Sequence, residues 1–386
     1  MHRRVFLTVS GATFIAPHAW ASASTIWSHA FGDYMLEHLT ATHTPGASVA
    51  VVKEGRIAFA RGYGYADVET ARHVTPATIF QIASISKTVT ATALMLLWQD
   101  GAFKLDDPIA PHLDFPVVNP AFPNVPISFR ELFTHTSSIS DAEYSDLDFA
   151  NVNVPSLRDF LTEYLVPGGK WYEAEKCYSG ATPGTVWSYS NVAVALLGYL
   201  GERLSGKSLE AFTRDRIFEP LGMRNTSWRY EGVSDDHLAL PYDFVGGRFK
   251  RLARTRYPDW PSGLLCTSAE DFAKFLASYI KATLLKRETI NVMFTPSPVE
   301  ITEINFGFAG WRQGLIWELE PMGGKTIAFH PGGDLGATTL AAIDVAHRTA
   351  ALCFANATPT TGKGSFEKEV VYRLLEKADA QSSPFF

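Results

Sequence analysis

The chain has little cysteine and lacks the motifs that usually accompany metal chemistry. Only three cysteines occur in 386 residues, Cys177, Cys266 and Cys353. They are too few and too far apart for a disulfide framework or a zinc site. Two of them could pair in an oxidising compartment, and the sequence leaves open which, although buried small hydrophobes are the expected state. No H-E-x-x-H or C-x-x-C motif is present, so no metal or other cofactor is expected.

Strong charge of one sign and very long apolar runs are also missing. The net charge is -6 without long charge runs, which argues against a nucleic-acid partner, because such a partner needs a basic stripe. No segment beyond the N-terminal region resembles a membrane span. With 46% hydrophobic residues the chain can bury a sizeable core. The expected partner is a small-molecule or peptide substrate, and the oligomeric state stays open.

The first residues resemble a targeting signal. A twin arginine, Arg3-Arg4, precedes large apolar residues, a moderately apolar stretch and small-residue sites between Ala19 and Ala23. This order is typical of a bacterial export signal of the twin-arginine type, with an ordinary amphipathic N-terminus as the alternative. We assign residues 1–23 to an export signal and expect a periplasmic or secreted protein.

The stretch from Gln81 to Asp100 is the centre of the chain. It contains Ser84, then Lys87, then a run from Thr88 to Trp98 without an ionisable group, which predicts a buried helix. A helix beginning near Ser84 places the hydroxyl and the amine on one face. Burial lowers the pKa of a lysine, and a neutral lysine can take the proton of a serine nucleophile. The alternative is an N-cap serine followed by a solvated lysine.

Strand patterns lie at both ends of the chain around a mainly helical middle. We predict strands over 46–53, 56–65, 306–319, 326–330, 337–344 and 349–355. The predicted fold class is α/β, with an antiparallel sheet built from the N- and C-terminal segments, flanking helices and an inserted, mainly helical domain. The corresponding domains are 24–100 with 296–386 for the sheet and 101–295 for the insert. A cleft between them is the expected active site.

Two further segments carry residue types suited to a serine hydrolase. In Tyr189-Ser190-Asn191 the tyrosine can relay protons and the asparagine can bind an amide, although a core tyrosine and a capping asparagine are the simpler interpretation. In His330-Pro331-Gly332-Gly333 the glycines allow a close backbone approach, although a turn with a surface histidine would look alike. His135, in a Thr/Ser-rich loop, is expected to be structural and to bond backbone.

Several segments in the same order resemble one family, the penicillin-recognising serine hydrolases. This group includes class C β-lactamases, histidine-containing D-alanyl-D-alanine carboxypeptidases, D-aminopeptidases and β-lactamase-like esterases. The resemblance spans about residues 46 to 355 and is carried by FQIASISK (80–87), LDDP (105–108), FRELFTHTS (129–137), YSN (189–191), IFEPLGM (217–223) and HPGG (330–333).

The resemblance implies roles for the matching residues. Ser84 would be the acylated nucleophile, Lys87 its base and Tyr189 a partner in proton transfer. Asn191, His330 and Gly332 would contact the substrate or support the site. The backbone N–H groups of Ser84 and Gly333 would form the oxyanion hole. The implied function is an exported serine hydrolase that cleaves an ester or amide through an acyl-enzyme. A β-lactamase, an acyltransferase and a non-hydrolysing penicillin-binding or sensor protein are the alternatives.

Two positions depart from the pattern of the resembling family. His330 stands where class C β-lactamases carry lysine, which puts efficient β-lactam hydrolysis in doubt. Ser138 replaces the glycine that usually follows His-Thr-Ser, where we expect a local backbone change. The exact substrate is not specified by the sequence.

Overall fold

The computed structural model describes most of the chain. The described residues are 18–144, 154–228, 230, 233–254, 256–301, 310–322, 325–359 and 366–380. Residues 1–17 of the predicted export signal lie outside this set. Residues 18–23 form the beginning of helix α1 (His18–Ala41), and the signal stays a prediction.

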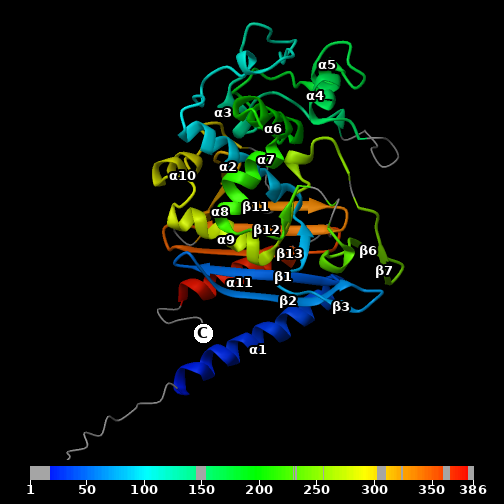
Figure 1. Ribbon diagram of the computed structural model, residues 1–386, viewed down its shortest axis with the longest axis vertical. Coiled ribbons are helices and arrows are strands. Elements are labelled where there is room, and N and C mark those ends of the chain that lie inside the picture. The colour runs from blue at the N-terminus through cyan, green and yellow to red at the C-terminus, as the bar shows by residue number, and fades with distance from the viewer. Residues whose placement is uncertain are drawn as a thin grey trace, which may run out of the picture.

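An eight-stranded antiparallel sheet crosses the middle of the molecule, between the helical part above it and α1 below it (Figure 1). Its strand order is β3-β2-β1-β13-β12-β11-β10-β9. The bounds are β1 (Gly46–Lys53), β2 (Arg56–Asp67), β3 (Arg72–His73), β9 (Arg312–Gln313), β10 (Glu318–Met322), β11 (Lys325–Asp334), β12 (Ala337–Asp344) and β13 (Thr349–Ala355).

The two ends of the chain meet in the middle of this sheet. Strand β1 pairs with β13 in antiparallel register, for example Val49 opposite Cys353. The hairpin β1–β2 continues the sheet on one side, and β12 with β11 continues it on the other. The predicted fold class, with a sheet assembled from both ends of the chain and flanked by helices, is confirmed.

Alternating residues of the strands fill two separate cores. Val49 and Val51 of β1 pack with α1 and α11 (Phe366–Ala380) on one face. Ala50 and Val52 belong to the larger core on the other face, which includes α9 (Ala269–Lys281), α2 (Ser86–Gln99) and α6 (Asn191–Ser205). Both faces of the sheet are covered, so its strands are apolar on both sides.

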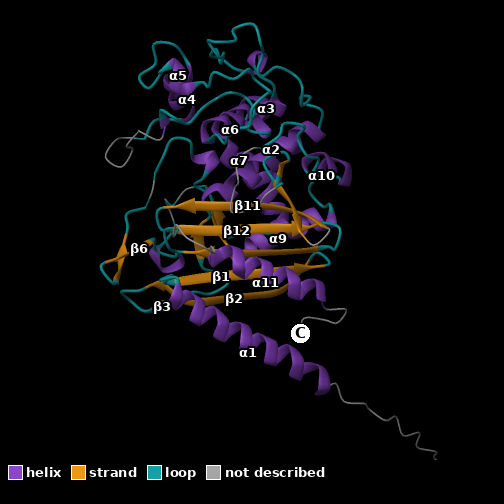
Figure 2. Cartoon of the chain, turned by 180° about the vertical axis from the view of Figure 1, so that it is seen from behind, coloured by secondary structure: helices purple, strands orange, loops and turns teal. Residues whose placement is uncertain are grey.

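The helical part, which includes α2, lies on the face of the sheet opposite to α1 and α11, and Figure 2 shows this arrangement from behind. Helix α2 packs against α6 in its interior. The shorter helices around this pair are α3 (Phe129–Phe133), α4 (Leu157–Leu165), α5 (Ala174–Cys177), α7 (Leu209–Thr213), α8 (Glu219–Leu221) and α10 (Arg287–Met293). A π-helical turn, Arg214–Phe218, joins α7 to α8.

The predicted insert, 101–295, also contains elements that belong with strands. Its β8 (Cys266–Ser268) pairs with β4 (Ile79–Gln81) and β5 (Thr226–Ser227) in a three-stranded sheet. A hairpin, β6 (Tyr242–Val245) with β7 (Arg248–Arg251), follows β5. Helix α9 packs directly on β1, β2 and β13. The domain boundaries at 100 and 296 therefore stay a prediction.

Two further properties bear on the sequence analysis. All three cysteines are buried and carry free thiols. Among the described residues, none of the helices combines the length and the apolar character needed to cross a membrane.

Candidate active site

Ser84 lies in a tight turn that leads into the central helix. The turn is a 3₁₀ helix, Ala83–Ile85, and α2 begins at Ser86, two residues later than a helix beginning at Ser84. Side chains at i and i+3 eclipse in a 3₁₀ turn, so Ser84 and Lys87 still face each other. Ala83 has a φ of 46°, in the left-handed region that non-glycine residues rarely adopt. Such local strain is common beside functional groups.

Lys87 is fully buried, with a relative exposure of 0%, and its amine has three polar neighbours. Nζ donates to Asn191 Oδ1 at 2.7 Å and to the backbone carbonyl of Ser262 at 2.8 Å. The third neighbour is Ser84 Oγ, 3.1 Å from Nζ. A neutral amine has two hydrogens and one lone pair. As an ammonium, Lys87 donates to all three neighbours, Ser84 Oγ included. Once it is neutral, its two hydrogens serve the two other acceptors, and its lone pair can receive the Ser84 O–H.

The surroundings of Lys87 favour this neutral form. Burial lowers the pKa of Lys87 to about 7, against the opposing effect of the Asp259, Asp141 and Asp334 carboxylates, which raise it. Desolvation penalises the ammonium, while nearby negative charge favours it. A substantial fraction of the amine is therefore unprotonated at neutral pH.

Tyr189 and Asn191 are placed by the beginning of α6. Ser190 caps the helix, because its hydroxyl accepts the backbone N–H of Ala193. Asp141 accepts the backbone N–H of Asn191 at 2.6 Å and the Ser190 hydroxyl at 2.8 Å. A carboxylate at a helix N-terminus is stabilised by the helix dipole and the free N–H groups. Asp141 thereby fixes the residues on either side of the cap.

The Tyr189 ring completes the group around Ser84. Burial raises its pKa above the usual range, although a hydrogen bond with the Ser84 hydroxyl opposes this. Lys87 Nζ lies 4.9 Å from the centre of the same ring. Tyr189 is therefore a neutral phenol at pH 7, able to donate its proton toward Ser84. The structure brings Ser84, Lys87, Tyr189 and Asn191 together, as the sequence analysis expected.

His135 holds the segment that carries Tyr189. Its ring stacks on the Tyr189 ring with centroids 4.6 Å apart. Its Nδ1 accepts the backbone N–H of Ser190 at 3.2 Å, and its carbonyl accepts that of Ser188 at 2.8 Å. Burial holds the pKa of His135 well below its usual value. The predicted backbone-bonding histidine is confirmed, and the stacking on Tyr189 was not foreseen.

The motif at 330–333 lies within strand β11. The predicted strand ended at His330, whereas β11 continues to Asp334. The pairing with β10 stops at Phe329, so the later residues pair with β12 alone. A proline is tolerated on such a free edge. A side chain at Gly332 would meet the Ile82 carbonyl at 2.5 Å and the Ser84 nitrogen at 3.2 Å, so only glycine lets β11 approach the nucleophile turn.

His330 lies on the same face of β11 as Gly332, because side chains alternate along a strand. Its Nδ1–H donates to the Pro331 carbonyl at 2.7 Å, which leaves Nε2 as an acceptor. Burial, with a smaller effect from the Lys87 charge, lowers the pKa of His330 to about 3. The imidazole is therefore neutral at physiological pH. Gly333, next along the strand, is exposed.

Asp259 and Ser262 are parts of the site that the sequence analysis missed. Asp259 is buried and accepts the Ser262 hydroxyl at 2.5 Å and the Tyr144 hydroxyl at 2.6 Å. It holds the turn whose Ser262 carbonyl meets Lys87. A carbonyl is present in every residue, so no signal in the sequence marks this one. Asp141 is equally unmarked, because an aspartate cap normally lies just before its own helix.

Ser138, which stands where the family pattern has glycine, adopts a left-handed backbone conformation. Its φ is 64°, in the left-handed region that glycine adopts without strain. Its hydroxyl accepts the Asn119 side-chain N–H at 2.9 Å. The side chain is thus anchored in a hydrogen bond, and His135 in the same loop also has a positive φ, of 55°.

A comparison with models of protein families shows to which family this chain belongs. The model described as "Beta-lactamase" matches residues 32–375. The chain belongs to the beta-lactamase family. It is therefore a member of the β-lactamase-like serine hydrolase superfamily, and the resemblance stated from the motifs is confirmed. The match includes the whole sheet, the central helix and all residues of the candidate site.

Individual beta-lactamase relatives are distant. The chain is 28% identical to protein flp of Staphylococcus aureus (strain MW2) over 247 residues, which are 63% of this chain and 47% of that protein. It thus spans about half the length of such curated relatives. The octameric penicillin-binding protein homologue from Pyrococcus abyssi superposes with a TM-score of 0.76 and 26% identity, covering 89% of this chain and 76% of that one. The D-amino acid amidase from Ochrobactrum anthropi SV3 superposes with a TM-score of 0.72 and 23% identity, covering 92% and 100%.

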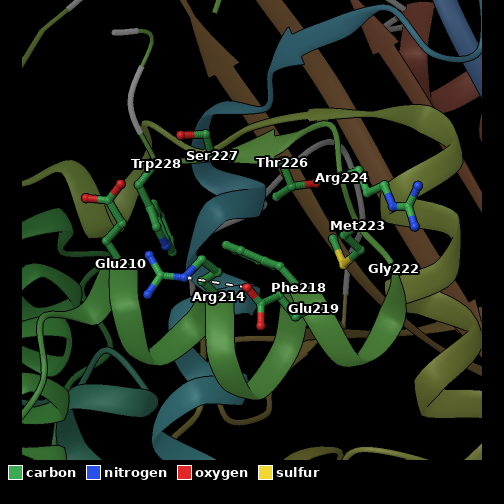
Figure 3. A pocket seen from close by; sticks show the side chains of 10 residues that line it. All are labelled: Glu210, Arg214, Phe218, Glu219, Gly222, Met223, Arg224, Thr226, Ser227 and Trp228. Carbon is green, nitrogen blue, oxygen red and sulfur yellow. Dashed lines mark ion pairs between the residues drawn. The ribbon is translucent and has the colours of Figure 1, made fainter. Parts of the chain in front are cut away.

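A separate cavity of about 520 Å³ lies between the π-helical turn, α8 and β5 (Figure 3). Its apolar wall includes Phe218 and Trp228, and Arg214 and Glu219 lie at its rim. None of the candidate site residues lines it. Trp228 packs edge-on against Trp260 at 5.2 Å, and Trp260 is two residues from Ser262.

Proposed function

We propose that this protein hydrolyses an ester or amide bond through an acyl-enzyme on Ser84. The observation that carries the proposal is the contact of the fully buried Lys87 amine with Ser84 Oγ at 3.1 Å, with Asn191 Oδ1 and the Ser262 carbonyl as its other two partners. A serine hydroxyl needs such a base to become a nucleophile. Membership of the beta-lactamase family supports the same chemistry.

In the first step the Ser84 oxygen attacks the substrate carbonyl and Lys87 takes the Ser84 proton. The bond to the leaving group then breaks, and Tyr189 gives its proton to the departing oxygen or nitrogen. Lys87 returns its proton to Tyr189, whose ring lies close to the amine. Water repeats the sequence on the Ser84 ester and releases the acid. General acid–base assistance of this kind contributes about 10²- to 10⁴-fold to the rate.

The developing oxyanion has two proposed donors, the backbone N–H groups of Ser84 and Gly333. Gly332 brings the two chain segments close enough for a shared ligand. Preorganised N–H donors of this type are often the largest single contribution to acyl transfer. The side-chain amide N–H of Asn191 is proposed to bind the substrate carbonyl, because its Oδ1 is already occupied by Lys87.

The motif at residues 330–333 restricts the range of substrates that we propose. A lysine at position 330 would offer a positive charge to a substrate carboxylate, whereas His330 has a pKa of about 3 and is neutral. Penicillins and peptides ending in D-alanine carry a carboxylate on the leaving side. We therefore propose esters and amides without that carboxylate as the main substrates, and weak turnover of β-lactams. The alternatives of acyl transfer and a stable, non-hydrolysed adduct stay open.

Covalent labelling tests the proposal. A fluorophosphonate should add to the folded protein with a stoichiometry of one, and peptide mapping should locate the adduct on Ser84. A panel of nitrophenyl butyrate, alanine amides, a D-alanyl-D-alanine peptide and nitrocefin should show turnover of the first two classes ahead of the others. Folded protein that gives neither an adduct on Ser84 nor ester turnover would disprove the proposal. An adduct that forms but is never released would instead favour a binding or sensor protein.

We also propose export through the twin-arginine route, on the strength of Arg3-Arg4 and the segment after them. Fusing residues 1–30 to a reporter that is active only after twin-arginine export tests this. Replacement of Arg3 and Arg4 by lysine should abolish reporter activity, and unchanged activity would contradict the proposal.

A further inference from the structure

Strand β11 carries side chains on both sides of the nucleophile turn. His330, Gly332 and Asp334 share one face of the strand, because side chains alternate. Gly332 is the point that contacts the Ser84 turn. His330 and Asp334 therefore lie on opposite sides of Ser84 along the strand, each two residues from Gly332.

The Asp334 carboxylate is held entirely by neutral donors. Oδ2 accepts the Gln81 side-chain N–H at 2.8 Å and also the Tyr257 hydroxyl. Oδ1 accepts the backbone N–H of Leu335 at 2.7 Å. Across the described part of the chain, Asp334 has no basic side chain as a partner. The carboxylate is thus fixed in place without an ion-pair partner of its own among the described residues.

A second layer of contacts orients these donors. The Tyr230 hydroxyl donates to Gln81 Oε1, so the Gln81 amide nitrogen must face Asp334 and Tyr257. Gln81 belongs to β4, three residues before Ser84, and pairs with Cys266 of β8. The orientation of the carboxylate is therefore built into the same segment that carries the nucleophile.

Asp334 differs from the two other carboxylates that act on Lys87. Asp259 is buried in the Ser262 turn, where it accepts the Ser262 and Tyr144 hydroxyls. Asp141 is half-buried, and its oxygens accept the Ser190 hydroxyl and the Asn191 backbone N–H at the α6 cap. Asp334 is half-exposed, beside the exposed Gly333. Of these three carboxylates, Asp334 is the one that a ligand at the strand edge can reach.

The direction of the substrate follows from the proposed function, on which this inference rests. Tyr189 protonates the leaving group and lies beside Lys87, three residues after Ser84, whereas Asp334 is held by Gln81, three residues before Ser84. The acyl half then extends toward the Gln81 side of the turn, where Asp334 lies. We infer that Asp334 binds a positively charged amine on the acyl half of the substrate, so that the preferred substrates are aminoacyl esters or amides with a free amino group.

Two esters that differ in one group test this inference. Alanine benzyl ester and benzyl isobutyrate have nearly the same shape, but the first carries an ammonium where the second carries a methyl group. We expect the wild-type protein to hydrolyse one enantiomer of the alanine ester with a kcat/KM about 10- to 100-fold higher than that for benzyl isobutyrate, which is the range for a hydrogen bond to a charged group. The variant Asp334→Asn should lose most of this ratio of the two kcat/KM values. Any effect of the substitution on Lys87 changes the rates of both esters alike and cancels in the ratio.

A matched variant controls for the loss of a carboxylate. Asp379 on α11 pairs with Lys325 on the other face of the sheet, and Asp379→Asn should leave the ratio unchanged. If Asp334→Asn does not fold, the salt dependence of the wild-type protein serves instead, because sodium chloride should lower kcat/KM for the alanine ester only.

The outcomes separate this inference from the function beneath it. Equal kcat/KM for the two esters in the wild-type protein, or an unchanged ratio in Asp334→Asn, would overturn the inference alone. Failure of the wild-type protein to hydrolyse either ester, or nitrophenyl butyrate, would overturn the proposed hydrolase and the inference with it.

Discussion

The two faces of the eight-stranded sheet are packed in different ways. The face against α1 and α11 is a core of aliphatic and aromatic side chains, such as Val371 and Leu374 of α11. The face toward α2 also has a large apolar core, but polar side chains are buried there too, among them Lys87, His330 and Asp259. The first face stabilises the fold. The second face is less stabilising than it could be, because it buries polar groups that the chemistry needs. The predictions below test that division.

The largest effect is expected at Lys87. Replacing Lys87 by alanine removes the base and leaves the Ser84 hydroxyl with its proton, so kcat/KM for a neutral ester should fall by about 10⁴-fold or more. Single-turnover kinetics should place the loss in acylation. Activity within tenfold of the wild-type protein would break the comparison, because the buried amine would then serve structure alone.

Tyr189→Phe should have the next largest effect. The change keeps the ring that stacks on His135 but removes the phenolic proton. We expect a loss of about 10²- to 10³-fold in kcat. The loss should shrink for esters with good leaving groups such as nitrophenolate, because these need no proton. A loss of the same size for good and poor leaving groups would contradict the proposed role.

The opposite face should respond in stability and not in rate. Leu374 of α11 is fully buried, and Leu374→Ala should lower the free energy of unfolding by about 2–5 kcal/mol. Denaturant unfolding measures this. At a temperature where the variant is folded, kcat/KM should equal that of the wild-type protein, and a large loss of rate would show that the two faces are coupled.

The pH dependence of stability should single out Lys87. Its folded pKa of about 7 lies below the ordinary value of 10.5, so the unfolded chain binds more protons between these values and stability rises with pH there. The difference in unfolding free energy between the wild-type protein and Lys87→Met should therefore increase by up to about 1.4 kcal/mol per pH unit from pH 7 to 9. Parallel pH profiles would mean that the amine is not neutral in the fold.

The smallest expected effect is at Asp259. Its charge raises the pKa of Lys87, so Asp259→Asn should move the midpoint of the pH–rate profile to lower pH. The asparagine keeps one acceptor oxygen for one of the two hydroxyls, and its amide N–H can donate to the other. A midpoint that moves upward would contradict the electrostatic role of Asp259.

Much of the sheet could be predicted from the sequence. The predicted strands at 337–344 and 349–355 have the bounds of β12 and β13, because apolar β-forming residues end at clear turn residues in each case. Strand β11 was predicted too short, since Pro331, Gly332 and Gly333 normally end a strand. Here the free edge beyond Phe329 removes the need for those N–H groups, which is a property of the neighbouring strand.

The residues of the site also divide into those that could be placed from the sequence and those that could not. Ser84 and Lys87 are close in sequence, and local geometry was enough to place them together. Tyr189, Asn191 and His330 were placed by motifs that say little singly. They became informative because they occur along the chain in the same order as in the family. The Ser262 carbonyl, Asp259 and Asp141 reach the site from distant segments, 175 residues from Lys87 for Ser262. Their contribution depends on the tertiary fold, which no local pattern encodes.

The most direct test of the central claim is the rate of Ser84 acylation as a function of pH. With a fluorophosphonate or a nitrophenyl ester in single-turnover conditions, the rate should rise with pH and level off with a midpoint near pH 7, as Lys87 loses its proton. A rate that stays constant between about pH 5.5 and 8.5 would contradict the account. So would an adduct that forms on a residue other than Ser84.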